Sequence, residues 1–382
     1  MDQETSAPSL AIGTDSVSGI ATACVRPGGP PGKPRPMDLK FEQVAPENIE
    51  EVISFLRETF RASGDAAFLQ PDHVRWQFFE PRPDWDGSRG YVLRTEGRIV
   101  AHACVVPNRY LTPDGAVVQS IVVIDWAADP SFPGAGLLVM QDLATLTDVR
   151  VGFRGSAIVR AMVRKAHSGK NTLERILGEV ITAKRTFRPW IFAFSNPSWR
   201  ALGRAGREVW RNVRRPLRST GDWTAVPVDR FDGSLPDLRL RGRRLNLVLP
   251  VRTPELLNYM LRCPSVRFSG YLIRKGAEIR GHLLLADLGE EIRLADLVID
   301  SDMIADWEAC YTLAVATAKK YYPRAAHLVA TAAPTLLQPV LAQTGFTAIK
   351  RAPMTLQDNR SVLKPGYVPV LNMMDSDAAY LL

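Results

Sequence analysis

The chain has 382 residues, of which 46% are hydrophobic and 23% are charged, a composition typical of a globular protein long enough for two domains. No apolar run approaches the roughly 20 residues of a membrane-spanning helix, and the four cysteines are too widely spaced for a disulfide framework or a metal site. The formal charge of +8 is local, because residues 189–225 hold seven arginines against one glutamate and one aspartate.

This distribution argues against a nucleic-acid partner, since nucleic-acid-binding proteins more often spread basic charge over a folded face with stacking aromatics. The sequence begins Met1-Asp2-Gln3-Glu4, which is acidic where a secretory signal is basic. We therefore expect a cytoplasmic protein.

Residues 1–36 are rich in glycine, proline, serine and threonine and cannot bury enough apolar surface to fold. We expect a disordered tail there and ordered structure from Met37, which is also a candidate alternative start. The sequence that begins at Met37 predicts a short strand, a turn at Pro46 and an amphipathic helix from Ile49 to Phe60.

Three antiparallel strands are predicted next, at about residues 90–95, 98–106 and 116–126. The stretch ADPSFPGAGLLVMQDLATL follows, with Gly134 and Gly136 at the start of a predicted helix. Free N–H groups at such a start favour a bound phosphate, although a plain strand-to-helix turn explains the glycines as well. A P-loop and a dinucleotide fingerprint are excluded, because no Lys-Ser/Thr and no third glycine follow.

Beyond the glycines we expect a strand near 148–153, a break at Gly155-Ser156, a helix to about residue 166 and a closing strand in GEVITAKRTF. The segment 189–206 is an alternative source of the late strand and helix. That alternative leaves 150–188 as a long insertion, which the usual lengths of loops disfavour.

This order of elements resembles the GNAT superfamily of N-acetyltransferases, whose acyl-CoA loop is usually written Q/R-x-x-G-x-G/A. The residues that fill the loop here are Ser131, Phe132, Pro133, Gly134, Ala135 and Gly136, with Ser131 in place of the usual first residue. The resemblance implies that acetyl-CoA or another acyl-CoA binds with its diphosphate on the N–H groups of residues 132–137, up to Leu137. It also implies that Trp126, Ala127 and Ala128 pair with the pantetheine like an added strand, and Ser156 completes the candidate cofactor-binding set.

Acyl transfer to an amine requires that the acceptor lose a proton and the departing thiolate gain one. GNAT members often use a carboxylate on a central strand and a tyrosine on the late helix, but residues 148–188 contain no tyrosine, so the general acid stays unassigned. Asp125 is the candidate base by position, with a plain hydrogen-bond acceptor as the alternative. His102 and Tyr110 lie on neighbouring strands as further candidates; His102, like His282 in the second half, is otherwise a packed core histidine.

The outline of the first half recurs after residue 225, without a glycine loop and with acidic residues from Asp300 to Asp306 that would repel a phosphate. We therefore expect an α+β (mixed α/β) fold of two tandem GNAT-like units, each a mostly antiparallel twisted sheet flanked by helices. The predicted divisions are a tail over 1–36, an acyl-CoA-binding domain over 37–188, a basic linker over 189–225 and a degenerate GNAT-like domain over 226–382. Near the end, Asp375 and Asp377 are candidates to close over the cleft, although a solvated tail is commoner.

Residues 198–215 of the linker place apolar side chains at helical spacing with arginines between them. Such a basic amphipathic helix can lie on an anionic membrane surface. The commoner role is to dock its apolar stripe on neighbouring domains.

Three functions are consistent with these features. The first is acyl-CoA-dependent N-acyl transfer to a small amine or amino sugar, since tandem chains of this kind resemble those tied to bacterial surface-polysaccharide synthesis. The second is an aminoacyl or peptidoglycan-type transferase, which does not need the CoA loop that this chain keeps. The third is a non-catalytic acyl-CoA sensor or scaffold. Hydrolase and metal-enzyme motifs are absent, and the acceptor, acyl length and oligomeric state are left open.

Overall fold

A computed structural model describes residues 38–147, 149–152, 174–191, 194, 198–236, 246–333, 337–358 and 361–380. Residues 38–382 form one compact unit. The predicted tail, the break at Gly155-Ser156 and the helix expected up to residue 166 lie outside the described residues.

The first half of the chain contributes strands and helices close to the predicted ones. They are β1 (Lys40–Gln43), α1 (Ile49–Phe60), α2 (Pro71–Phe79), β2 (Gly90–Thr95), β3 (Arg98–Leu111), β4 (Val117–Ala128), α3 (Ala135–Leu143), β5 (Val149–Gly152), β6 (Glu174–Thr186) and α6 (Trp199–Arg214).

The second half repeats a similar order of strands and helices. They are β7 (Trp223–Val228), β8 (Leu247–Pro250), α7 (Pro254–Leu261), β9 (Arg267–Lys275), β10 (Glu278–Asp287), β11 (Glu291–Ile299), α8 (Ile304–Tyr321), β12 (His327–Ala332), α9 (Gln338–Gln343), β13 (Thr347–Asp358) and β14 (Val368–Pro369). Two short 3-10 turns follow, η4 (Met373–Asp375) and η5 (Asp377–Ala379).

Apolar periodicity explains why these segments form helices on the two faces of the sheet. Helix α1 buries Ile49, Val52, Ile53 and Leu56 at helical spacing, and they pack with α2 on one face of β2, β3 and β4. Helix α3 packs on the opposite face of these strands. In the second half, α8 and α9 share a core with β10, β11 and β12.

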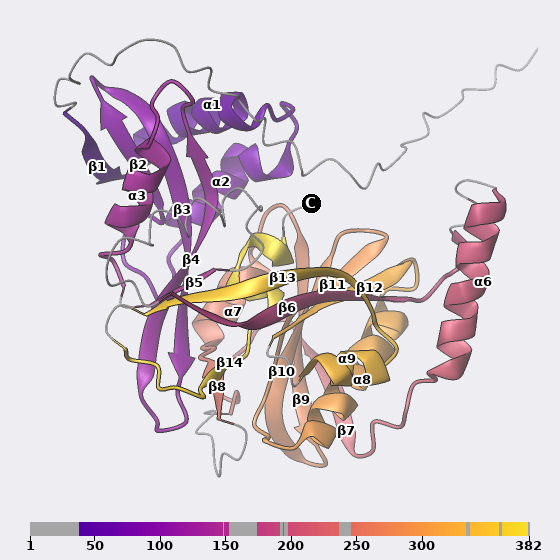
Figure 1. Ribbon diagram of the computed structural model, residues 1–382. Helices are drawn as coiled ribbons and strands as arrows, with labels where there is room; N and C mark the ends of the chain where they lie inside the picture. Colours follow the sequence, from indigo (N-terminus) through magenta and orange to yellow (C-terminus); the bar gives the residue numbers. More distant parts are fainter. Residues whose placement is uncertain are drawn as a thin grey trace, which may run out of the picture. The chain divides into compact units, whose positions relative to one another are not determined.

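One sheet runs through the unit and joins the two halves. Within the described residues its strand order is β1-β2-β3-β4-β5-β13-β6-β12-β11-β10-β9-β7, and Figure 1 shows β13 beside β6 at the centre. The expected closing strand of the first half, GEVITAKRTF, is a strand, but it pairs with β12 and β13. Strand β13, near the end of the chain, pairs instead with β5.

The two halves thus exchange their late strands. A strand's own sequence sets its alternation of buried and exposed residues but not the identity of its neighbours, because backbone hydrogen bonds are the same for any partner. None of the helices in the described part of the chain is long and apolar enough to cross a membrane.

Candidate active site

Strands β4 and β5 run side by side only briefly before they diverge. Their parallel pairing joins Ser120 to Val149 and Ile121 to Arg150. From residue 122 on, β4 keeps β3 as its neighbour on one side, and no strand of the described ranges pairs with its other side. That edge of β4 presents backbone N–H and C=O groups that an extended ligand can pair with like an added strand.

A β-bulge lies in β4 at Asp125. Cys104 of β3 faces Ile124, whereas His102, two residues earlier, faces Ala127, so β4 holds one extra residue between these pairs. Asp125 has a φ of 48° there, in the left-handed region that residues other than glycine seldom adopt. Such strain is tolerated where the surroundings hold it in place, and it clusters at functional sites.

The free edge of β4 leads to the start of α3. Gly134 precedes the helix with a φ of 94°, a conformation that favours glycine. Among the described residues, the backbone N–H groups of Gly134 and Gly136 have no hydrogen-bond acceptor. These donors, with the positive end of the helix dipole, form an arrangement suited to a phosphate.

The first turn of α3 packs tightly against the end of β4. A Cβ on Gly136 would lie 3.2 Å from the Cβ of Ala128 and 3.2 Å from the indole nitrogen of Trp126. The Trp126 indole N–H donates a hydrogen bond to the Gly136 carbonyl at 2.9 Å. A side chain at position 136 would therefore separate the loop from the strand.

One cation lies beside this loop. Arg98, at the start of β3, pairs with Asp129, donates to the Ser131 hydroxyl at 3.3 Å and stacks over the Phe132 ring. Its side chain is more than half exposed. An arginine therefore lies beside Ser131, the position where GNAT loops usually hold a glutamine or arginine.

The carboxyl group of Asp125 lies between β4 and α2 and is partly buried. Gln77 of α2 donates a hydrogen bond from Nε2 to Asp125 Oδ2 at 2.8 Å. Burial, reinforced by the nearby charge of Asp377, raises the pKa of Asp125 to about 7, and the Gln77 hydrogen bond opposes the rise. A carboxyl group with this pKa changes protonation state near neutral pH.

His102 contacts the same bulge but lacks the properties of a base. Its Nδ1 lies 3.0 Å from the backbone carbonyl of Asp125, which requires an N–H at Nδ1. The ring stacks on Phe78, and burial lowers the pKa of His102 to about 4. We infer a neutral imidazole that supports the bulge.

Tyr110 is not brought together with Asp125. It pairs with Val118 in β4, eight positions along β3 from His102, which corresponds to about 26 Å of extended strand. Its hydroxyl is buried, and burial and the nearby Asp375 raise its pKa well above 10. The candidate catalytic residues therefore divide between two places.

Most residues from 370 to 380 are buried, which corrects the preference for a solvated tail. Asp375 is fully buried and pairs with Arg252 at 2.6 Å, and Arg252 also pairs with Asp296 at 2.9 Å. Asn108 of β3 donates to the Asp375 carbonyl at 3.0 Å. Arg252, far away in the sequence, is a buried cation that pairs with both Asp296 and Asp375, and this second ion pair keeps Asp375 in the interior.

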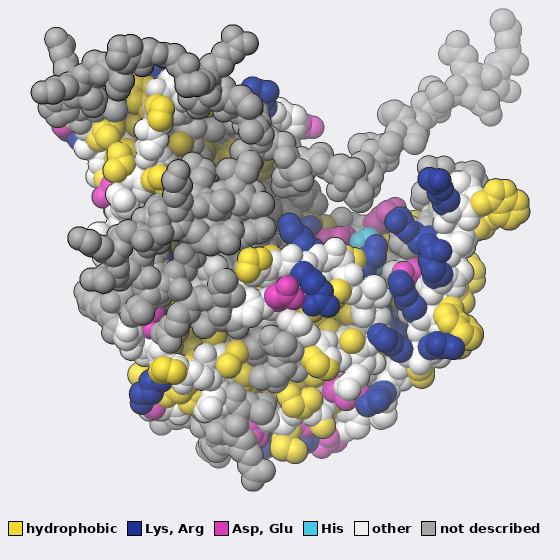
Figure 2. All heavy atoms as spheres, in the orientation of Figure 1, with side chains coloured by type: hydrophobic (Ala, Val, Ile, Leu, Met, Phe, Trp, Pro, Cys, Tyr) yellow, Lys and Arg dark blue, Asp and Glu magenta, His cyan; other side chains and the backbone are white. Residues whose placement is uncertain are grey.

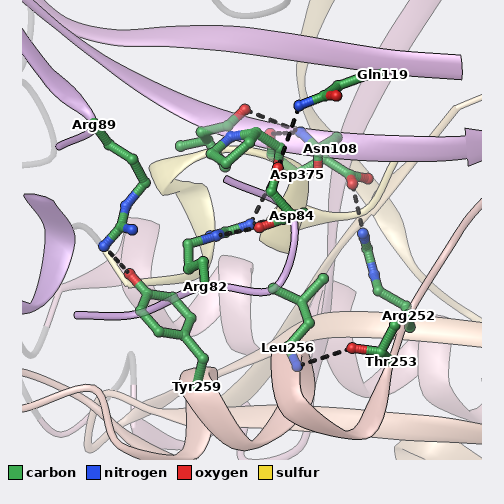
Figure 3. A network of polar contacts seen from close by, with 12 residues as sticks. Arg82, Asp84, Arg89, Asn108, Gln119, Arg252, Thr253, Leu256, Tyr259 and Asp375 are labelled. Carbon is green, nitrogen blue, oxygen red and sulfur yellow. Dashed lines mark hydrogen bonds and ion pairs between the residues drawn. The ribbon is translucent and has the colours of Figure 1, made fainter. Parts of the chain in front are cut away.

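Figure 3 shows a polar network around this tail. Arg82 pairs with Asp84 at 2.8 Å, and Arg89 donates to the backbone carbonyls of Trp76 and Gln77 at 2.9 and 2.6 Å. The buried Arg89 lies beside the hydroxyl of Tyr259, a residue of the second half. The network thus connects α2, the segment just before β2, and α7.

Aromatic side chains, none of them a predicted site residue, line the same region. Trp76 of α2 stacks on Tyr259 of α7 with ring centroids 4.7 Å apart, and its indole meets the ring of Tyr380 edge-on at 5.2 Å. A helical pattern marks Trp76 as a core position but does not reveal a partner 183 residues away.

An open cleft of about 540 Å³ lies between the two halves over this aromatic cluster. Its walls combine apolar and charged side chains. They are Pro46, Ile49, Asp72, Arg75, Trp76, Phe79, Glu80, Arg262 and Pro264.

The predicted loop residues Trp126, Ala127, Ala128, Ser131, Phe132, Gly134, Ala135, Gly136 and Leu137 lie together along β4 and the start of α3. Ser156, the remaining predicted cofactor residue, lies outside the described residues. In the ranges that the structure describes, no group of three or more His, Cys, Asp or Glu residues is arranged to hold a metal ion.

A mixed sheet whose fourth and fifth strands diverge, with a glycine turn and a helix between them in the chain, is the fold of GCN5-related N-acetyltransferases, and this chain has that fold. No protein-family model matches the sequence, and no curated protein matches it. Solved structures do.

A GCN5-related N-acetyltransferase from Anabaena variabilis is 12% identical, with a TM-score of 0.53 over 84% of this chain and 73% of that one. A GCN5-related N-acetyltransferase from Kribbella flavida is 13% identical, with a TM-score of 0.50 over 84% and 71%. N-myristoyltransferase from Saccharomyces cerevisiae, solved with bound myristoyl-CoA, is 12% identical, with a TM-score of 0.52 over 90% and 88%. At these identities the likeness concerns the fold.

Proposed function

We propose that this chain is an acyl-CoA-dependent N-acyltransferase. The observation that carries the proposal is the edge of β4 beyond Ile121, which no described strand covers and which leads to two N–H groups, of Gly134 and Gly136, that find no acceptor in the described ranges. An extended thiol arm followed by a diphosphate matches these two features in order. The neighbouring fold of N-myristoyltransferase with bound myristoyl-CoA supports the same class of co-substrate.

In this proposal the pantetheine arm pairs with Trp126, Ala127 and Ala128, and the diphosphate accepts hydrogen bonds from the start of α3. Arg98, beside the loop, supplies a positive charge for the phosphates. The Arg98 guanidinium is exposed, so it can leave its ion pair with Asp129 and bind a phosphate, which carries more negative charge.

Asp125 is the proposed general base. The amine nitrogen attacks the thioester carbon, the C–S bond breaks, and the amine proton passes to the Asp125 carboxylate as the amide forms. A pKa of about 7 matches this task, because the group is partly ionised at neutral pH and still accepts a proton readily. The proton donor to the departing thiolate stays unassigned among the described residues.

The second half is proposed to hold no cofactor. Strands β11 and β12 also diverge after a short parallel pairing, but the end of the chain contacts both of them. Leu371 bridges to Ala333 next to β12, and Arg293 of β11 donates to the Ala378 carbonyl at 3.0 Å. In the first turn of α8, the Asp306 carboxylate accepts hydrogen bonds from Lys275 and Ser301. This negative charge lies where a phosphate would bind at the start of the helix.

The acceptor is proposed to enter through the cleft between the halves, since pockets commonly form where two domains meet. In its wall Asp72 pairs with Arg75 and Glu80 pairs with Arg262, so a positively charged amine would have to exchange with these arginines. The proposed acceptor class is a small amine or amino sugar, with acetyl as the first acyl group to test and surface-polysaccharide synthesis as one setting for such a reaction.

The test measures free thiol released from acetyl-, octanoyl- and myristoyl-CoA in the presence of an amine panel, together with the melting temperature at each acyl-CoA concentration. A ligand that binds only the folded state raises stability by mass action. Stabilisation with amine-dependent thiol release supports the proposal. Stabilisation without turnover for any amine indicates an acyl-CoA-binding protein instead, and no stabilisation by any acyl-CoA rejects both.

A further inference from the structure

Helix α6 (Trp199–Arg214) lies at the side of the unit, next to the end of β6 (Figure 1). Ser198 caps its first turn by accepting a hydrogen bond from the Ala201 N–H at 3.2 Å. At about 100° per residue, its side chains divide into three stripes of different character.

The first stripe faces the rest of the unit. Ala205 is buried, Asn212 donates to the Thr186 carbonyl at the end of β6 at 3.0 Å, and the Glu208 side chain is only 13% exposed. This inward face is narrow and largely polar, so the packing of α6 against the rest of the unit covers little of the apolar surface of the helix.

The second stripe is apolar and open to solvent. Trp199 is 89% exposed, Trp210 is 56% exposed and Val213 is 67% exposed, with Leu202 between them. These residues fall within about 80° of one another around the helix. Exposed apolar side chains gathered in one row indicate a contact surface rather than chance exposure.

The third stripe lies beside the second and is wholly basic. It consists of five exposed arginines that fall within a further arc of about 80°, namely Arg200, Arg204, Arg207, Arg211 and Arg214. Figure 2 shows dark-blue side chains gathered along α6 with yellow ones beside them. Arg214 lies over the Trp210 ring at 4.4 Å, which joins the two stripes.

We propose that the apolar and basic stripes of α6 together bind the surface of an anionic lipid bilayer. The apolar row enters the boundary between headgroups and acyl chains, where tryptophan is favoured, and the arginines pair with lipid phosphates. A groove or surface for nucleic acid would pair the arginines with stacking aromatics, but aliphatic Leu202 and Val213 share the exposed row. The occupant that fits both stripes is therefore a bilayer.

The proposal is independent of acyl transfer, because α6 lies outside the site built by β4 and α3. It implies that the protein binds the surface of a bilayer as a peripheral protein.

The experiment measures co-sedimentation of the full chain with vesicles of phosphatidylcholine alone or mixed with phosphatidylglycerol. The chain is expected to bind the anionic vesicles and to lose about tenfold or more in affinity in two variants, W199A/W210A and R200Q/R204Q/R207Q. The second variant should also lose most of its salt dependence. All five substituted residues are exposed, so the melting temperature should stay unchanged.

A matched control replaces three exposed basic residues elsewhere, R57Q/K320Q/R324Q, which removes the same charge and should leave vesicle binding intact. Equal losses in the control and the α6 arginine variant would overturn the proposal, since net charge alone would then explain binding. No binding to anionic vesicles would also overturn it, as would tight binding of duplex nucleic acid that the same α6 variants abolish while vesicles stay unbound.

Discussion

At the scale of the residue, the carboxyl group of Asp125 combines a strained backbone, burial and one hydrogen bond from Gln77. An unfolded aspartate titrates near 3.8, whereas burial raises the pKa of Asp125 in the folded chain to about 7. Between these values the unfolded chain releases a proton that the folded chain keeps. The contribution of this group to stability is therefore full below about pH 4 and is lost as pH rises through 7.

Replacing Asp125 with Asn should lower kcat by about 10² to 10⁴-fold, the usual contribution of a general base, with acyl-CoA affinity preserved. The wild-type rate should rise with pH through about 7, and the variant should lose this dependence. Its melting temperature should exceed that of the wild type at pH 8 and approach it at pH 4. Retained activity with the same pH profile would show that Asp125 is a hydrogen-bond acceptor only.

The position of Asp125 at the end of a central strand was predictable, but its bulge was not, because the extra residue in β4 appears only once β3 is paired with it. The position of His102 on the strand next to Asp125 was predictable. Its role was not, because the hydrogen bond between its Nδ1 and the Asp125 carbonyl, which stabilises the bulge, appears only in the folded structure.

At the scale of the element, the first turn of α3 determines whether a phosphate can approach. Gly134 and Gly115 both have positive φ, 94° and 89°, and a Cβ at either would meet nothing within 4 Å. The two glycines thus carry the same backbone strain on substitution, and only Gly134 adjoins the proposed diphosphate site.

Gly134→Ala should weaken CoA binding by about tenfold or more, because the strained turn rotates the N–H groups away from the phosphates. Gly115→Ala, in the β3–β4 hairpin, should lose a similar amount of stability, about 1 kcal/mol, with CoA affinity unchanged. Fluorescence titration with CoA and urea denaturation of both variants measure the two effects. Equal affinities in the two variants would mark the loop as an ordinary turn.

The helices and strands themselves follow from local patterns, as α1 and the β2–β3–β4 meander illustrate. The exchange of β6 and β13 does not, because strand neighbours depend on contacts between residues far apart in the chain. The burial of the segment after residue 370 could not be predicted for the same reason. Asp375 is held there by Arg252 and Asn108, which lie far away in the sequence.

At the scale of the whole molecule, Arg252 links β11 to the last described segment through Asp296 and Asp375, and Asn108 of the first half contacts that same segment. Against the effect of burial, Arg252 and His282 lower the pKa of Asp296 to about 2, while burial keeps the pKa of Asp375 above its ordinary value. Removing the cation leaves two buried carboxyl groups side by side without the positive charge that they share.

Arg252→Met should therefore lower the free energy of unfolding by about 3–5 kcal/mol, measured by urea denaturation. Arg351→Met is the matched control, because Arg351 pairs with Glu179 at the surface, where both side chains are more than half exposed. That control should change stability by at most about 1 kcal/mol. Similar losses in the two variants would mean that the buried cluster stabilises the fold no more than a surface ion pair does.

The central claim is that one acyl-CoA site exists per chain, at the edge of β4 and the start of α3. Isothermal titration of the full chain with acetyl-CoA and with longer acyl-CoAs tests it most directly. We expect one molecule bound per chain, binding weakened about tenfold by Gly134→Ala, and no change on reversing the charges of Asp300 and Asp302 in the second half. Two equivalent sites per chain, or no binding of any acyl-CoA at saturating concentration, would contradict the account.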